Sequence, residues 1–198
     1  MKKLLALSAV FFTAACSSPA PVLQKTADYN PQTQARIRIY GQNQKPSTVE
    51  AGIDCNSGRK GQKFSTGGSL GEAFGSLTGT VKSQSIGIAP TETSKRLGEK
   101  NGILSRAFFR EFVIPAGKAA NVQAFYVGLT NVNETPTHVI IMKEGSCQSK
   151  KGSFVPQAGK DYEVIGVDGR ACGVAVYEVS SQGNLKNIPL NEAVSCRK

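Results

Sequence analysis

Apolar and polar residues alternate along several short stretches of this chain, which is the pattern of strands with one buried face. Residues 35–40 alternate alanine and isoleucine with two arginines, so the arginines are expected on the exposed face. Residues 49–55 repeat the alternation, and we expect Cys55 to point to the same face as the core. A third short strand is expected at 85–88.

The second half of the chain contains longer apolar runs separated by turn residues. Asp168-Gly169 stands between the last two runs and is a strong short-range hairpin signal. Glu111 interrupts the first of these runs, where it is expected to point outward as an alternating polar residue. The runs cover residues 106–114, 121–129, 138–142, 153–155, 162–167 and 171–179.

Some eight short strands, bounded by glycine, proline and asparagine turns, indicate an all-β fold. We expect a single antiparallel β-sandwich over residues 35–198, either immunoglobulin-like or transthyretin-like. The exception is the glycine-rich segment 58–79, which contains seven glycines and is expected to be a long loop.

One short helix is predicted inside this loop. Ser69 and Glu72 form a capping-box pair, and Leu70, Phe74 and Leu77 follow at helical spacing. An amphipathic, capped helix on a slack loop can become ordered when a partner docks. Leu70, Phe74 and Leu77 are therefore the candidate docking residues.

The first residues of the chain carry the most specific signal. Two lysines precede an apolar run over residues 4–15, and a cysteine, Cys16, follows directly. This is the layout of a secretory signal peptide, too short to span a bilayer permanently. Thr13-Ala14-Ala15-Cys16 resembles the lipobox of bacterial lipoproteins. An ordinary secretory signal cut after Ala15 is the alternative.

The resemblance to lipoproteins has definite implications. It implies that residues 1–15 are removed and that Cys16 is acylated, so the chain is held in a membrane by its N-terminal lipid. Ser17, next to the cysteine, implies sorting to the outer membrane, facing the periplasm, with surface exposure left open. Residues 16–34, rich in proline and small residues, are expected to be a flexible linker.

Five cysteines become four once Cys16 carries lipid, and an even number in an exported chain predicts two disulfides. We favour Cys147–Cys172, because each flanks a strand of the C-terminal hairpin region, which leaves Cys55–Cys196. Cys55–Cys147 with Cys172–Cys196 is the main alternative. The cysteines lack Cys-x-x-Cys spacing, so no metal site or cofactor is predicted.

The net charge is +10, or +8 once Lys2 and Lys3 leave with the signal peptide. A basic excess suits anionic partners, but the cations are scattered and no nucleic-acid motif accompanies them. The expected partner is an envelope protein or an anionic envelope polymer, and nucleic acid is not expected.

Catalytic chemistry has one candidate. Residues 67–71 match Gly-x-Ser-x-Gly, and the single histidine, His138, lies downstream of Ser69. That motif belongs to a parallel sheet with crossover helices, whereas this chain predicts hairpins, and Ser69 is better explained as a helix cap. The favoured hypothesis is a non-enzymatic binding or scaffold module of the cell envelope. An envelope hydrolase using Ser69 and His138, or a module binding acidic glycan or lipid, are the alternatives.

Overall fold

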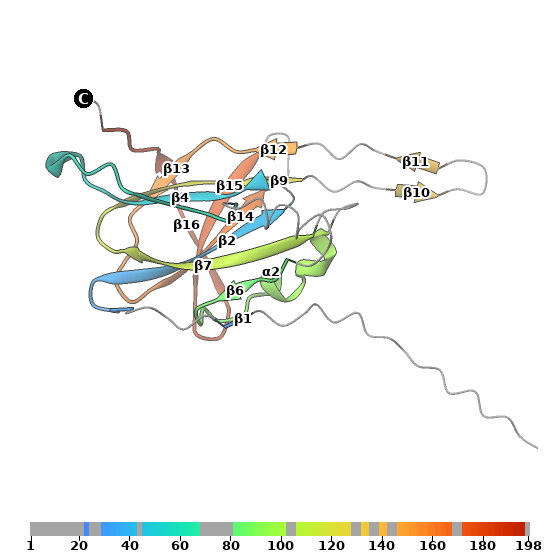
Figure 1. Cartoon of the computed structure of the whole chain (residues 1–198), viewed down its shortest axis with the longest axis horizontal. Coiled ribbons are helices and arrows are strands. Elements are labelled where there is room, and N and C mark those ends of the chain that lie inside the picture. Colours follow the sequence, from blue (N-terminus) through green and yellow to red (C-terminus); the bar gives the residue numbers. More distant parts are fainter. Residues whose placement is uncertain are drawn as a thin grey trace, which may run out of the picture.

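The computed structural model describes residues 22–23, 29–42, 45–67, 81–101, 106–127, 132–134, 139–141, 146–167 and 172–196. It is an all-β protein, as the alternating pattern predicted, and two sheets packed face to face form its body (Figure 1). None of the helices in these residues has the length and hydropathy to cross a membrane.

The larger sheet has eight strands. Its order is β1-β6-β7-β2-β14-β15-β16, with β3 pairing with β2 at one end. The strands are β1 (Val22–Leu23), β2 (Gln34–Gln42), β3 (Lys45–Pro46), β6 (Gln84–Ser85), β7 (Ala107–Pro115), β14 (Asp161–Val167), β15 (Gly173–Val179) and β16 (Leu185–Ile188).

The second sheet has five strands in the order β17-β13-β8-β4-β5. Two short hairpin-like pairs, β9·β12 and β10·β11, complete the strands, and β10 and β11 lie beyond the body of the sandwich (Figure 1). The strands are β4 (Thr48–Ile53), β5 (Gln62–Ser65), β8 (Ala119–Gln123), β9 (Phe125–Val127), β10 (Val132–Glu134), β11 (Val139–Ile141), β12 (Ser146–Gln148), β13 (Gly152–Phe154) and β17 (Asn191–Glu192).

The core lies between the two sheets and is built by the predicted alternation. Ala35, Ile37 and Ile39 of β2 face inward, where they meet residues of β4, β8 and β13 from the opposite sheet. Ile37 and Ile39 are completely buried. Burying a side chain of this size contributes ~1.5–3 kcal/mol relative to leaving it exposed. The inward residues of every second position therefore hold the two layers together.

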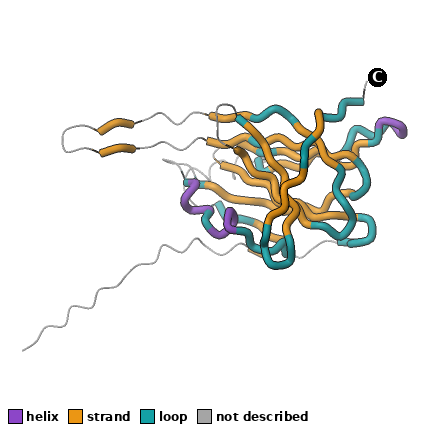
Figure 2. Tube along the Cα trace, turned by 180° about the vertical axis from the view of Figure 1, so that it is seen from behind, coloured by secondary structure: helices purple, strands orange, loops and turns teal. Residues whose placement is uncertain are grey.

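The outer face of the larger sheet is covered as well. Residues 81–101 cross it and carry the short helices α2 (Glu92–Lys95) and η2 (Leu97–Lys100), seen as the neighbouring purple turns in Figure 2. Leu97 is buried against Ala107 and Phe109 of β7, with Tyr40 of β2 beside them. We call residues 81–101 the cover segment. Outward-facing residues of β2 and β7, such as Arg38, Phe109 and Glu111, are therefore buried beneath the cover segment.

The cover segment overturns the expected exposure of two charged residues. Arg38 and Glu111 were predicted to point outward, and they do lie on the face away from the main core. They are nevertheless buried, with exposed fractions of 1% and 5%, because the cover segment lies over them. The alternation gave the correct face but could not reveal that a second layer exists.

The sheet is mixed, whereas the hairpin signals predicted only antiparallel pairing. β2 pairs parallel with β14, and β1 and β7 both pair parallel with β6. Strands 125 residues apart, such as β2 and β14, are brought together by the sandwich core, and no local turn signal reports such pairing. The predicted antiparallel pair of β14 with β15 is present, although its turn lies outside the described residues.

Three local expectations were wrong. Cys55 does not face the core: β4 ends at Ile53 after a bulge at Gly52, where φ is +80°, and Cys55 begins the exposed 3-10 helix η1 (Cys55–Ser57). The glycine-rich segment is not a structureless loop throughout, because β5 lies in it and pairs with β4. Residues 132–134 lie in the turn region expected between the apolar runs 121–129 and 138–142, and they form β10.

The segment expected as a flexible linker also contains structure. Val22 and Leu23 form β1 and pair with Gln84 and Ser85 of β6. Nearer the sandwich, the ring of Tyr29 lies 5.1 Å from the guanidinium carbon of Arg36. The fold therefore begins before residue 35.

Candidate functional site

The structure describes Cys55, Cys147, Cys172 and Cys196 but not the other predicted site residues. The lipidation residue, the candidate docking residues and the serine–histidine pair stay predictions, because all of them lie outside the described residues: Cys16, Ser69, Leu70, Phe74, Leu77 and His138.

The four remaining cysteines form Cys147–Cys172 and Cys55–Cys196, which is the pairing that the sequence favoured. The first joins β12 to the residue before β15. The second ties the C-terminal segment to η1 across a sequence separation of 141 residues. Loop entropy gives upper values of ~3.5 and ~5 kcal/mol for closing the two loops.

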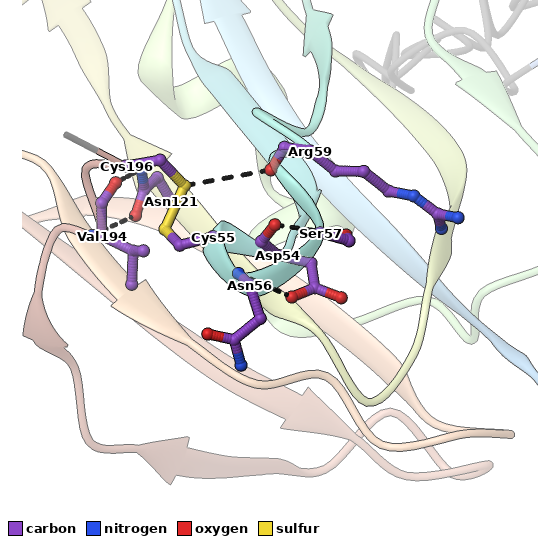
Figure 3. The surroundings of a disulfide bond; sticks show 8 residues. All are labelled: Asp54, Cys55, Asn56, Ser57, Arg59, Asn121, Val194 and Cys196. Atoms are coloured by element: carbon purple, nitrogen blue, oxygen red, sulfur yellow. Dashed lines mark hydrogen bonds between the residues drawn. A yellow bond between two sulfur atoms is a disulfide. The ribbon is translucent and has the colours of Figure 1, made fainter. Parts of the chain in front are cut away.

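The surroundings of Cys55–Cys196 show how the end of the chain is held (Figure 3). The side-chain amide of Asn121, on β8, donates to the carbonyl of Val194 and accepts from its N–H, both at 2.9 Å. Asp54 caps η1 by accepting from the N–H of Asn56 at 3.2 Å. The disulfide and the Asn121 side chain thus hold the C-terminal segment against the five-stranded sheet at two neighbouring points, Cys196 and Val194.

The most concentrated group of charges lies under the cover segment. Arg38 donates from Nε and Nη2 to Oε1 of Glu111, at 2.9 and 2.7 Å, and from Nη1 to Oε2 of Glu163 at 3.0 Å. Its Nη2 also donates to the carbonyls of Ile88 and Ala89, at 2.8 and 3.1 Å. One guanidinium therefore links three strands of the large sheet to the cover segment.

Glu111 binds the cover segment directly through its second oxygen. Oε2 accepts from the hydroxyl of Ser85 at 2.9 Å and from three successive N–H groups, of Ile86, Gly87 and Ile88, at 2.7, 3.1 and 3.2 Å. Gly87 has a φ of +103°, which permits the tight turn that aims these donors at one atom. Such a concavity of backbone N–H groups binds anions, and here the anion is a side chain.

Glu163 fastens the other part of the cover segment. Its Oε1 accepts from the hydroxyl of Tyr40 at 2.9 Å, and its Oε2 accepts from the hydroxyl of Thr91 at 2.7 Å. Thr91 is also the N-cap of α2, where it forms a capping box with Ser94. The buried carboxylate therefore fixes the residue from which the helix starts.

These three groups, which we call the buried charge cluster (Arg38, Glu111 and Glu163), carry one positive and two negative formal charges. Every carboxylate oxygen accepts from at least one donor within 3.0 Å. Such carboxylates are committed to structure, and none is presented to a substrate. The sequence carries no signal that separates the cluster from exposed charges, because Arg38 alternates with isoleucine in the same way as the partly exposed Arg36.

The opposite side of the sandwich carries a different feature. The outer face of the five-stranded sheet has a shallow polar hollow of about 170 Å³. We call it the polar hollow, and its polar lining consists of Thr48, Glu50, Lys63, Asn121, Gln123 and Lys151. The hollow has no aromatic platform among these residues.

Strand register places the charges of the polar hollow. Lys63 of β5 lies directly opposite Glu50 of β4, and Glu50 lies opposite Asn121 of β8. Lys151 precedes β13 and lies at the other side, beside Gln123. Lys63, Glu50 and Lys151 make no ion pair with another residue in the part of the chain that the structure describes. Two ammonium groups thus flank a polar floor.

Comparison of the chain with models of known protein families, with curated proteins and with solved structures gives no match. The functional interpretation therefore rests on the residues and geometry described above.

Replacing Arg38 by alanine should destabilise the fold strongly, because two buried carboxylates would lose their shared cation. We expect a loss of about 3–5 kcal/mol in the free energy of unfolding. Urea unfolding followed by circular dichroism measures it. Arg36→Ala is the matched control: its pair with Asp161 at 2.7 Å is partly exposed, and its loss should cost only ~1 kcal/mol. Equal losses of unfolding free energy in the two variants would show that the buried charge cluster stabilises the fold no more than the partly exposed Arg36–Asp161 pair.

Stability should fall as the pH rises above about 10, the ordinary pKa of tyrosine. Burial, assisted by the charge of Glu163, raises the pKa of Tyr40 well above its usual value. The unfolded chain therefore releases a proton that the folded chain retains, and the stability present below pH ~10 is lost above it. Urea unfolding between pH 8 and 11 should show a steeper decline for the wild type than for Tyr40→Phe. Identical slopes would show that Tyr40 does not contribute.

Proposed function

We propose that this chain is an outer-membrane lipoprotein whose β-sandwich faces the periplasm and serves as a non-enzymatic binding or scaffold module of the envelope. The observation that carries the proposal is the combination of an acylation-type N-terminus, ending at Cys16, with a domain whose four other cysteines are joined as disulfides. Disulfides of this kind persist in oxidising compartments such as the periplasm.

Two properties of the domain support a binding role. Three kinds of contact make the sandwich rigid: the core between the two sheets, the buried charge cluster and the two disulfides. A rigid domain presents its surfaces without paying an ordering cost when a partner docks. Glu111 and Glu163 are bound within the protein through all four of their carboxylate oxygens, so these two carboxylates hold the domain together.

Replacing Cys16 by alanine should move the protein from the membrane fraction to the soluble periplasmic fraction, because the acyl chains would be absent. Fractionation of cells and mass spectrometry of the N-terminal peptide measure this. Ser18→Ala, two residues away, is the control and should leave the protein in the membrane fraction. A wild-type peptide that carries no acyl mass would refute the lipoprotein proposal.

A second candidate function is the binding of an anionic envelope polymer, and the polar hollow favours it. Lys63 and Lys151 stand on opposite sides of a floor formed by β4 and β8, and neither forms an ion pair among the described residues. Three strand spacings separate β5 from β13, or about 14 Å. An extended polyanion crossing the strands could meet both ammonium groups, with hydroxyl groups against Glu50, Asn121 and Gln123.

The double variant Lys63→Gln/Lys151→Gln should bind polygalacturonate more weakly than the wild type. Each exposed charge pair is worth ~0.2–1 kcal/mol, so the affinity should fall about two- to thirtyfold. Affinity electrophoresis measures it, with neutral dextran as the control polymer. Lys82→Gln/Lys95→Gln, on the other side of the sandwich, removes the same charge and should have a smaller effect. Equal effects would refute a specific role for the hollow.

A further inference from the structure

The place where the chain enters the fold limits how the domain can lie on a membrane. β1 begins at Val22, so five residues separate it from Cys16. Six peptide units span at most ~20 Å, because an extended chain covers no more than ~3.3–3.6 Å per residue. If Cys16 is acylated, as the proposed function holds, the surface around the start of β1 lies close to the lipid head groups.

The direction of β1 identifies that surface. β1 runs parallel to β6, with Val22 beside Gln84, so the N-terminal end of β1 lies on the side of Ser83. Ser83 borders a small depression that is also lined by Gly98 of η2 and by Arg106. The start of β1 therefore lies beside β6, and Ser83, which directly precedes β6, borders η2 and the beginning of β7. Figure 1 shows β1, β6 and α2 on the same side of the molecule.

This side of the molecule is basic. Residues 81–106 contain five cations and two carboxylates, a net charge of +3. The carboxylates are already paired, Glu92 with Lys95 at 3.0 Å and Glu99 with Arg96 at 2.7 Å. The cations are Lys82, Lys95, Arg96, Lys100 and Arg106.

The buried charge cluster gives this surface a fixed orientation. Arg38 holds the carbonyls of Ile88 and Ala89, and Glu163 holds Thr91 at the start of α2. Leu97 anchors η2 in the apolar cluster beneath it. Lys95 and Arg96 are therefore carried by a segment that is fastened before them, at residues 88–91, and directly after them, at Leu97.

We propose that the cover segment is a membrane-docking surface, which lies against anionic phospholipid head groups while the polar hollow on the opposite sheet faces away from the membrane. The short span from Cys16 to β1 brings the cover segment close to the membrane, and the basic charge of the segment is complementary to the anionic head groups. A basic residue close to an anionic bilayer contributes roughly fivefold in affinity, and the effect declines within about 8 Å at physiological salt. Acylation supplies the anchor, and the basic surface sets the orientation.

The test uses the mature chain with Cys16→Ala, so that vesicle binding depends on the surface and not on the lipid. Cosedimentation is measured with vesicles of 70% phosphatidylcholine and 30% phosphatidylglycerol, and with phosphatidylcholine alone. We expect binding to the anionic vesicles only, weakening as salt is raised. Lys82→Gln/Lys95→Gln/Lys100→Gln should lose about tenfold or more in affinity.

The matched control is Lys60→Gln/Lys63→Gln/Lys151→Gln, which removes the same charge at residues outside the cover segment. It should lose less than about threefold. Equal losses would show attraction by net charge alone, and absence of wild-type binding, or equal binding to neutral vesicles, would overturn the proposal. Circular dichroism checks that each variant is folded. The Cys16→Ala variant has no acyl chains, so a failure to bind vesicles would not bear on the acylation of Cys16. That acylation is tested separately, by the mass of the N-terminal peptide of the wild type.

Discussion

The fold depends on how the chain accommodates one buried guanidinium. Arg38 lies between Glu111 and Glu163 at hydrogen-bonding distance from both, and its exposed fraction is 1%. A cation in that position would be costly without both carboxylates, and the carboxylates would be costly without the donors of the cover segment. The three strands and residues 81–101 must therefore be in place together.

This interdependence makes the cover segment part of the folded domain, although it has little regular structure. The described helices α2 and η2 are only four residues long each, too short to be stable alone. They are held by contacts with the sheet: Thr91 binds Glu163, and Leu97 packs on Phe109. Hydrogen bonds specify the position of the segment, and the buried side chains of Ile88 and Leu97 add apolar burial. A basic surface is thereby given a rigid support.

The two outer faces of the sandwich are consequently unlike each other. One is covered by a basic segment close to the point where the chain enters the fold, and the other is an open, polar sheet surface with Lys63 and Lys151 beside its hollow. The Cys55–Cys196 disulfide fastens the chain's last residues beside this open sheet. With the anchor that we propose at Cys16, one face would lie toward the membrane and the other toward the surroundings, which suits the proposed binding or scaffold role.

Local sequence determined the strands of the core, because alternation such as that of Ile37 and Ile39 identifies the side chains that are buried on one face. It did not predict β1, β5 or β10. It also favoured the two disulfides, because the cysteines were few. Only the tertiary structure decided which outward residues are exposed. Arg38 and Glu111 look like solvent-facing charges in their strands, and their burial depends on Glu163, 125 residues from Arg38, and on a cover segment with no periodicity of its own. Parallel pairing and the bulge that turns Cys55 outward were likewise decided by contacts distant in sequence.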